Sequence, residues 1–270
     1  IVLVVLVLLS AVSTIAEAQE NPINKLKPLR TKTTLVRDGQ AQASIVMPTD
    51  AGGQAAARVL QRQIEAKTGC VLPLVGDEDA WETLWGKQNL IVVGNLMTNK
   101  VFTMLYCLHY ACSDAAWPGA DGYELRTVCD ARGLGQNIVV LGGSNERGVR
   151  AAVEAFLQKV EPGDSLVLDH FIDTRIDGKA FTPLSDEELA KQPTSLVKQT
   201  QNYYRTGNPQ FAELAKRGYL KFAKNMETIG TISFTHPYGW FGICFDLLEE
   251  APVFTDEERL IITNGLVTFM

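Results

Sequence analysis

Residues 137–160, NIVVLGGSNERGVRAAVEAFLQKV, constrain the fold more than any other stretch of the chain. They begin with the aliphatic run IVVL, which is typical of a strand buried on both faces. Gly142 and Gly143 then permit a sharp turn, and Ser144 or Asn145 is expected to cap a helix. The apolar residues that recur at helical spacing are Val149, Ala152, Val153, Phe156, Leu157 and Val160. The stretch therefore predicts a strand, a glycine turn and an amphipathic helix.

The glycine turn has two possible interpretations. A glycine turn before a helix can hold a phosphate, because free backbone N–H groups and the helix dipole converge there. However, GGSNERG fits neither GxGxxG nor GxxxxGK[ST], and no acidic ribose-binding position can be placed downstream. We therefore predict a structural turn and no nucleotide or other cofactor.

Strand and helix signals alternate through the rest of the first half. Asp38 and Gly39 form a strong tight-turn signal, so a hairpin is predicted between strands 34–36 and 43–46. Further expected elements are a helix ending at Gly69, a short helix at 81–85, a helix at 97–110, and strands at 90–93, 123–128 and 165–168. Alternation of this kind predicts one α/β domain over residues 33–173, with a mixed sheet and covering helices.

Several motifs within residues 43–160 occur in the order found in a known family. Two strand signals, NLIVVG at 89–94 and DGYEL at 121–125, precede Arg147–Gly148 and a helix that ends in Ala-Phe-Leu at 155–157. This pattern resembles the small α/β domain of alpha-glucuronidases and beta-hexosaminidases. In that family the domain precedes the catalytic domain and carries no catalytic acid or base. The resemblance therefore implies a carbohydrate context without specifying a reaction.

The N-terminal residues have the pattern of a secretory signal. Residues 1–9 are all apolar, and Ala-Glu-Ala at 16–18 is an A-x-A cleavage site. The apolar run is too short to span a bilayer, which takes about 20 apolar residues. We predict a signal peptide over residues 1–18 whose charged start is missing, no stable membrane span, and a secreted or periplasmic protein. The basic linker at 19–32 is not expected to bind nucleic acid, because the net charge is −6 and no basic stripe follows.

The second part of the chain has a different pattern. Residues 174–210 read as a linker with helical segments, including the helix-start signature SDEE at 185–188. Helical periods dominate residues 211–270, where Thr255 and Glu258 form a capping box. Three helices leave too much apolar surface uncovered for a complete domain. We therefore expect the sequence to end inside an all-α domain.

The helical part carries a second resemblance. DLL at 246–248, then Pro252, Phe254 and TDEER at 255–259, are similar to the opening helical hairpins of (α/α) toroid polysaccharide lyases of the heparinase and alginate-lyase kind. Glycoside hydrolases also use such toroids. The resemblance implies that the second domain is the start of an (α/α) toroid.

The residues with the most chemical potential lie in one short segment, THPYGW at 235–240. A lyase that cuts uronic-acid sugars needs a base to remove the C5 proton, and we predict His236 and Tyr238 as the catalytic residues. Trp240 offers a flat face on which a sugar ring can stack. The alternative is that this segment only packs, with His236 satisfying a loop. We interpret His109 and His170 as structural.

Carboxylates and cysteines offer further candidates. Asp246, Glu249 and Glu250 could serve a glycoside hydrolase, although a solvated helix end is the simpler interpretation. The five cysteines could form disulfides in an exported chain or remain buried thiols: Cys70, Cys107, Cys112, Cys129 and Cys244. With no C-x-x-C pair and no histidine at zinc spacing, no metal site is predicted.

Together these patterns predict an exported carbohydrate-active protein that binds polysaccharide or oligosaccharide. The leading function is the N-terminal part of a polysaccharide lyase acting on uronic-acid-containing glycans. The alternatives are a glycoside hydrolase with a helical toroid and a glycan-binding module without catalytic activity.

Overall fold

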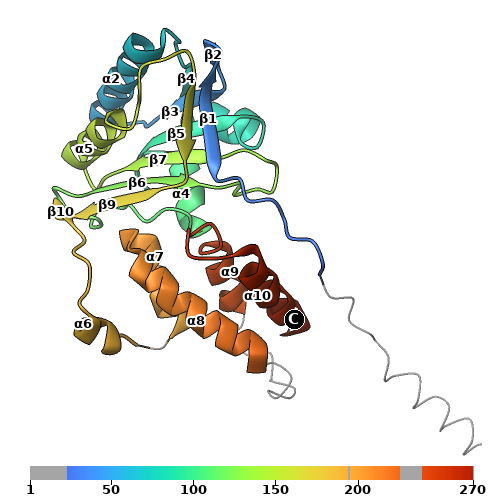
Figure 1. Ribbon diagram of the computed structural model, residues 1–270. Helices are drawn as coiled ribbons and strands as arrows, with labels where there is room; N and C mark the ends of the chain where they lie inside the picture. Colours follow the sequence, from blue (N-terminus) through green and yellow to red (C-terminus); the bar gives the residue numbers. More distant parts are fainter. Residues whose placement is uncertain (1–22, 194, 226–238, 270) are drawn as a thin grey trace, which may run out of the picture.

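The computed structural model describes residues 23–193, 195–225 and 239–269. Figure 1 shows a twisted sheet with helices on both faces, and a group of helices packed below it. The predicted signal peptide, the segment that contains His236 and Tyr238, and the last residue lie outside the described residues. The predicted α/β class is confirmed, since seven strands form one mixed sheet with covering helices.

The main sheet has the order β10-β9-β6-β7-β5-β3-β4. Strands β4, β3, β5 and β7 run parallel, whereas β6 is antiparallel to β7 and to β9, and β10 is antiparallel to β9. The strand bounds are β3 Ala43–Met47, β4 Leu74–Gly76, β5 Asn89–Gly94, β6 Tyr123–Val128, β7 Ile138–Gly142, β9 Ile172–Ile176 and β10 Lys179–Ala180. The predicted domain boundary at Asp173 therefore falls inside a strand of this sheet.

Two apolar cores lie on opposite faces of the sheet. Helices α2 (Ala51–Thr68) and α5 (Glu146–Leu157) pack on one face through residues such as Leu60 and Phe156. Helix α4 (Lys100–Cys107) packs on the other face through Phe102, together with the short helices α3 (Asp77–Asp79) and η1 (Ala80–Leu84). The central strands β3, β5 and β7 are largely apolar on both sides because both faces are covered.

A second, three-stranded sheet has the order β2-β1-β8, with β1 at Lys32–Arg37, β2 at Gln40–Ala41 and β8 at Leu166–Asp169. The predicted hairpin is therefore only partly correct. Asp38 and Gly39 do turn the chain, with φ of 50° and 70°, but they join β1 to the short β2. Strand β3 instead pairs with β5 in the main sheet. All but the last of its residues are buried, which a two-stranded hairpin could not achieve.

The predicted strand–turn–helix of residues 137–160 is confirmed as β7 followed by α5. Asn145 caps the helix by accepting a hydrogen bond from the Gly148 N–H. A Cβ atom on Gly143 would lie 2.3 Å from the backbone nitrogen of Val149, and one on Gly148 would lie 2.5 Å from the Gly122 carbonyl oxygen. These glycines are therefore required by close backbone packing inside the protein.

The helical part comprises α6 (Asp186–Ala190), α7 (Leu196–Thr206), α8 (Pro209–Asn225), α9 (Gly239–Asp246) and α10 (Asp256–Phe269). Its core includes Tyr203, Tyr219, Phe245 and Ile262, all of them buried. The predicted capping interaction at Thr255 is confirmed, since the Glu258 N–H donates to its Oγ1 at 3.1 Å. Within the described residues, no helix combines the length and apolar character needed to cross a membrane.

Candidate functional site

A cavity of about 380 Å³ lies where the end of α4 and the loop after it meet helices α7 and α9. We call it the aromatic cavity. Its walls come from three separate parts of the chain, namely residues 106–117, 200–205 and 240–247. The aromatic and polar side chains that line it include Tyr106, His109, Asp114, Trp117, Thr200, Gln201, Tyr204, Arg205 and Trp240. A concave site with this mixture of flat apolar faces and a few polar groups is typical of small-molecule binding.

His109 forms part of the wall because of the way α4 ends. The Tyr110 N–H donates to the Leu105 carbonyl oxygen at 2.8 Å, and the His109 N–H donates to the Tyr106 carbonyl oxygen at 3.1 Å. This is a Schellman motif, which requires a left-handed residue at the position of His109. The φ of His109 is indeed 67°, a conformation that costs a residue other than glycine about 1–2 kcal/mol.

The left-handed turn brings the imidazole of His109 against Trp240 of α9. Their ring centroids lie 5.1 Å apart with an interplanar angle of 50°. Trp240 is 39 % exposed, so part of its indole face remains open to the cavity and solvent. His109 thus lines the cavity, and its interpretation as a structural residue stays a prediction. No local sequence signal marked this position, because histidine is not the usual residue at a left-handed helix end.

Asp114 organises the neighbouring wall. Its Oδ1 accepts hydrogen bonds from the N–H groups of Ala116 and Trp117 at 2.8 and 2.9 Å, and its Oδ2 accepts from the Tyr106 hydroxyl at 3.0 Å. Burial alone would raise the pKa of Asp114, but the backbone N–H groups of Trp117 and Ala116 hold it below its usual value. Asp114 is therefore an anionic acceptor that fixes the Tyr106 side chain and the backbone at Ala116 and Trp117.

Arg205 supplies positive charge to the cavity. Its guanidinium carbon lies 5.9 Å from the centre of the Trp117 ring, and its side chain is exposed. No ion pair joins Arg205 to a carboxylate within the described ranges. A planar guanidinium with free donors is well suited to a carboxylate ligand.

Behind the cavity lies a buried ion pair. Glu124 and Arg126 on β6 are fully buried, and Glu124 accepts hydrogen bonds from the N–H groups of Cys112 and Ser113. Arg126 lies over the ring of Tyr204 with its guanidinium carbon 4.1 Å from the centroid. Burial lowers the pKa of Arg126, but Glu124 together with Tyr204 and Cys112 outweighs this effect, so the net shift is upward and the side chain stays charged. Both residues thus contact parts of the cavity wall from behind.

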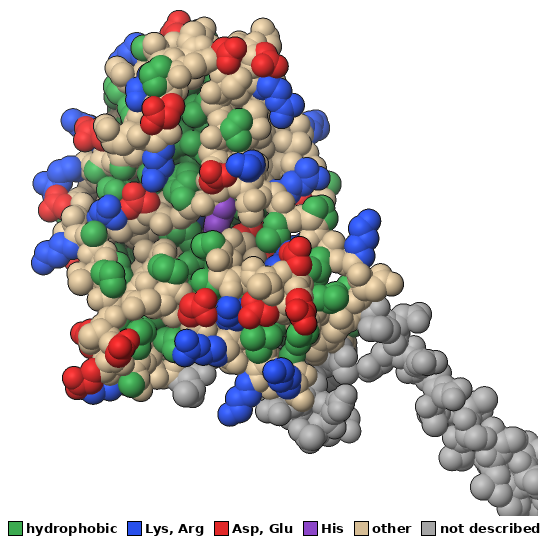
Figure 2. All heavy atoms as spheres, in the orientation of Figure 1, with side chains coloured by type: hydrophobic (Ala, Val, Ile, Leu, Met, Phe, Trp, Pro, Cys, Tyr) green, Lys and Arg blue, Asp and Glu red, His purple; other side chains and the backbone are tan. Residues whose placement is uncertain are grey.

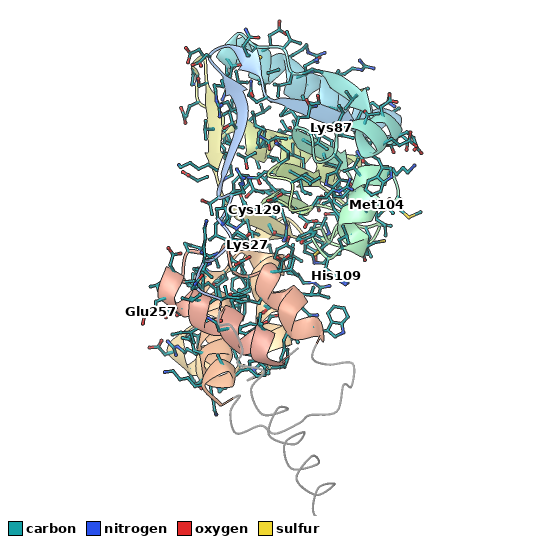
Figure 3. The ribbon with its side chains drawn as sticks, turned by 90° about the vertical axis from the view of Figure 1, so that its right-hand side faces the viewer. Lys27, Lys87, Met104, His109, Cys129 and Glu257 are labelled. Carbon is teal, nitrogen blue, oxygen red and sulfur yellow. The ribbon has the colours of Figure 1, made fainter. Side chains whose placement is uncertain are left out.

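A second charged cluster lies beside the cavity, at the end of α9. Lys27 pairs with Asp246 at 2.9 Å and also with Glu249, which in turn pairs with Arg259 at 3.2 Å. Figure 3 shows Lys27 beside Cys129, at the junction of the sheet and the helices. The interpretation of these carboxylates as a solvated helix end was wrong for Glu249, which is buried and paired.

Glu250 belongs to the same cluster. Burial, followed by the charges of Glu249 and Asp246, raises the pKa of Glu250 to about 8. Glu250 lies near Cys129, Tyr110 and Tyr203. Burial is the main cause that raises the pKa of each of these three groups, and the charge of Glu250 adds a smaller increase. Glu250 is therefore protonated at neutral pH in the folded chain.

The five cysteines are free thiols. Cys112 and Cys244 line the aromatic cavity, and burial raises their pKa values to about 12 and about 11. A thiol must ionise to act as a nucleophile, so neither is prepared for that role. Among the described residues, no group of three or more His, Cys, Asp and Glu side chains could hold a metal ion.

The structure brings together only part of the predicted site. Trp240 lines the cavity, and its role in sugar stacking stays a prediction, whereas His236 and Tyr238 lie outside the described residues. Tyr106, Asp114, Trp117 and Arg205 were not foreseen, since their proximity depends on long-range packing. On the face drawn in Figure 2, Lys and Arg side chains lie among Asp and Glu side chains without forming a continuous basic patch.

No family model matches the chain, and no curated protein matches it in sequence.

Proposed function

We propose that the chain is a carbohydrate-active protein that binds an acidic saccharide in the aromatic cavity. The observation that carries the proposal is the presence of two indoles, Trp117 and Trp240, in one cavity with the guanidinium of Arg205. The flat apolar face of a sugar ring packs well on an indole, and its hydroxyl groups can reach the polar lining. The volume of about 380 Å³ is sufficient for one or two sugar rings.

The charge of the cavity favours a sugar with a carboxylate group. Arg205 forms no ion pair with a carboxylate within the described ranges, whereas both oxygens of Asp114 are already engaged by Ala116, Trp117 and Tyr106. The cavity therefore offers a cation to a ligand but no uncommitted carboxylate among its described lining residues. Uronic acids provide the complementary charge.

A polysaccharide lyase remains the reaction we propose, within an exported protein. Such an enzyme removes the C5 proton of a uronate, and a neighbouring cation stabilises the negative charge that develops on the carboxylate side. Arg205 would supply the cation, and His236 or Tyr238 would supply the base. A hydrolase requires two free carboxyl groups at the scissile bond, and within the described lining Asp114 is the only carboxylate. A glycan-binding module without catalysis is the second candidate, because the open face of Trp240 is sufficient for binding.

Calorimetric titration would test the binding proposal. The ligands are tetramers of glucuronate, galacturonate and mannuronate, with cellotetraose as the neutral comparison. We expect at least one acidic tetramer to bind, and Trp240→Ala to weaken that binding about tenfold or more, a stacking-sized loss. Leu134→Ala is the control, because Leu134 is exposed and does not line the cavity. No binding to any of the four tetramers would contradict the proposal.

Arg205→Met tests the charge preference. We expect this variant to bind the acidic tetramer more weakly and to bind cellotetraose with unchanged affinity. Arg58→Met, on the exposed side of α2, should change neither affinity. Absorbance of unsaturated products then separates the two candidates. Product formation that disappears in His236→Ala or Tyr238→Phe supports a lyase, and binding without product supports a binding module.

A further inference from the structure

Tyr110 connects the two helices that carry aromatic side chains into the cavity. Its hydroxyl donates a hydrogen bond to Oδ2 of Asp246 at 2.6 Å. Its carbonyl oxygen accepts a hydrogen bond from the hydroxyl of Tyr204 at 3.0 Å. Asp246 is the last residue of α9, and Tyr204 belongs to α7. One residue at the end of α4 therefore contacts both opposing helices.

The loop after α4 contacts α9 at two points. Trp240 contacts His109, and Asp246 contacts Tyr110, so two consecutive residues bind positions six residues apart on one helix. Six residues span about 9 Å along an α-helix, which is enough to define both the axial position and the rotation of α9. Another side of α9 packs in the helical core, where the Tyr219 hydroxyl donates to the Phe241 carbonyl oxygen at 2.9 Å and Phe245 is buried. The contacts with His109 and Tyr110 fix the part of α9 that borders the cavity.

Asp246, which accepts the hydrogen bond from Tyr110, is also fixed by an ion pair. The other oxygen of Asp246, Oδ1, is 2.9 Å from Nζ of Lys27. Lys27 in turn belongs to the segment before β1, where its carbonyl oxygen accepts a hydrogen bond from Arg259 of α10. Burial and the neighbouring Asp246 raise the pKa of Tyr110, so its hydroxyl keeps the proton it donates.

We propose that Tyr110 is a positioning residue that sets the distance between the Tyr204 and Trp240 walls of the aromatic cavity. Tyr110 does not line the cavity, so it acts through these two side chains and through α9. The inference rests on the proposed function insofar as it concerns ligand binding. Its structural content, the placement of Trp240, can be tested without any ligand.

The ligand-free test is acrylamide quenching of Trp240 fluorescence. The signal of Trp240 is obtained by subtracting the spectrum of Trp240→Phe, which retains the other three tryptophans. In Tyr110→Phe we expect the quenching constant of Trp240 to rise about twofold, because loss of the hydrogen bond to Asp246 loosens the contact between the indole and His109. Tyr123→Phe is the matched control, since the Tyr123 hydroxyl lies 3.5 Å from Asp173 and does not reach the cavity. An unchanged quenching constant in Tyr110→Phe would overturn the inference.

The binding test uses the glucuronate tetramer. Tyr110→Phe and Asp246→Ala should each weaken binding of this tetramer about three- to tenfold. Asp246→Asn should bind it with nearly the wild-type affinity, because the amide oxygen still accepts the hydrogen bond from Tyr110. In a Trp240→Ala background, Tyr110→Phe should have no further effect, since the wall it positions is gone. Equal losses in both backgrounds would show that Tyr110 does not act through Trp240.

The two proposals can fail separately. If Trp240→Ala abolishes binding while Tyr110→Phe changes neither quenching nor affinity, the positioning inference is wrong and the proposed function stands. If Tyr110→Phe changes quenching while the wild-type chain binds no tetramer, the proposed function is wrong and the positioning of Trp240 stands. Thermal unfolding of each variant, with a Tm close to that of the wild type, separates both results from general unfolding.

Discussion

Nε of Arg126 lies 2.8 Å from Oε1 of Glu124, and neither side chain is exposed to solvent. The pair is a close charge contact without the alignment of a hydrogen bond, since the three guanidinium nitrogens of Arg126 have no hydrogen-bond partner among the described residues. Glu124 holds the backbone of Cys112 and Ser113, and Arg126 packs on Tyr204. One buried pair therefore supports two walls of the aromatic cavity.

Arg126→Met should destabilise the chain by about 3–5 kcal/mol, because it leaves the carboxylate of Glu124 buried without its cation. Urea unfolding measures the effect. Arg150→Met is the control, since its ion pair with Glu146 is exposed and should contribute little. Adding Glu124→Gln to Arg126→Met should recover part of the loss by removing the unpaired charge. A cost of Arg126→Met as small as that of Arg150→Met would contradict the prediction.

His109→Gly should separate stability from binding. Glycine adopts the left-handed conformation freely, so the substitution should leave Tm unchanged or raise it slightly. The same change removes the ring that contacts Trp240, so affinity for an acidic tetramer should fall. Differential scanning calorimetry and titration on the same sample measure both quantities. A parallel fall in Tm and affinity would show that His109 is needed mainly for folding.

Glu250 predicts a loss of stability at alkaline pH. Its pKa in the folded chain is about 8, above the ordinary value of 4.5, so the folded state holds a proton that the unfolded state releases. Stability from this group is full below pH 4.5 and is lost as the pH rises through 8. Glu250→Gln should therefore raise Tm at pH 9 and change it little at pH 4.5. Equal effects at both pH values would exclude titration of Glu250 as the cause.

The lowered pKa of His170 predicts a loss of stability at acidic pH. Burial, followed by the charge of Arg126, lowers the pKa of His170 to about 4, whereas the unfolded value is 6.5. The neutral ring shares a hydrogen bond with Thr127 at 2.8 Å. Stability from this group is present above pH 6.5 and is lost as the pH falls through 4. NMR titration should show the ring of His170 neutral at pH 5.5, and a midpoint near 6.5 would contradict the assignment.

The parts of the fold that the sequence predicted are those governed by local chemistry. The strand and helix of residues 137–160, the cap at Asn145 and the capping box at Thr255 depend on neighbours a few residues apart. The hairpin at Asp38 was half correct for the same reason. The tight turn is local, but the partner of β3 is decided by burial against β5, which lies far along the chain.

The candidate site depends on contacts that no local pattern encodes. Tyr110 and Asp246 are 136 residues apart, and Tyr204 and Tyr110 are 94 residues apart. The expectation that Trp240 stacks on a sugar follows from its indole chemistry alone, and it stays a prediction. The role of His109 could not be predicted, because a left-handed histidine at a helix end is visible only once the backbone is known.

The segment before β1 has a consequence for how the protein forms. Ile23 exchanges two hydrogen bonds with Asn264, across a separation of 241 residues. Contacts this distant in sequence slow folding, because loop closure must precede any gain from them. During synthesis the sheet can form early, yet α10 reaches Ile23 and Lys27 only after nearly all the described chain has emerged. The helical part should therefore consolidate last, and a nascent chain that stops before α10 should expose the helical core around Tyr219 and Phe245 to chaperones and proteases.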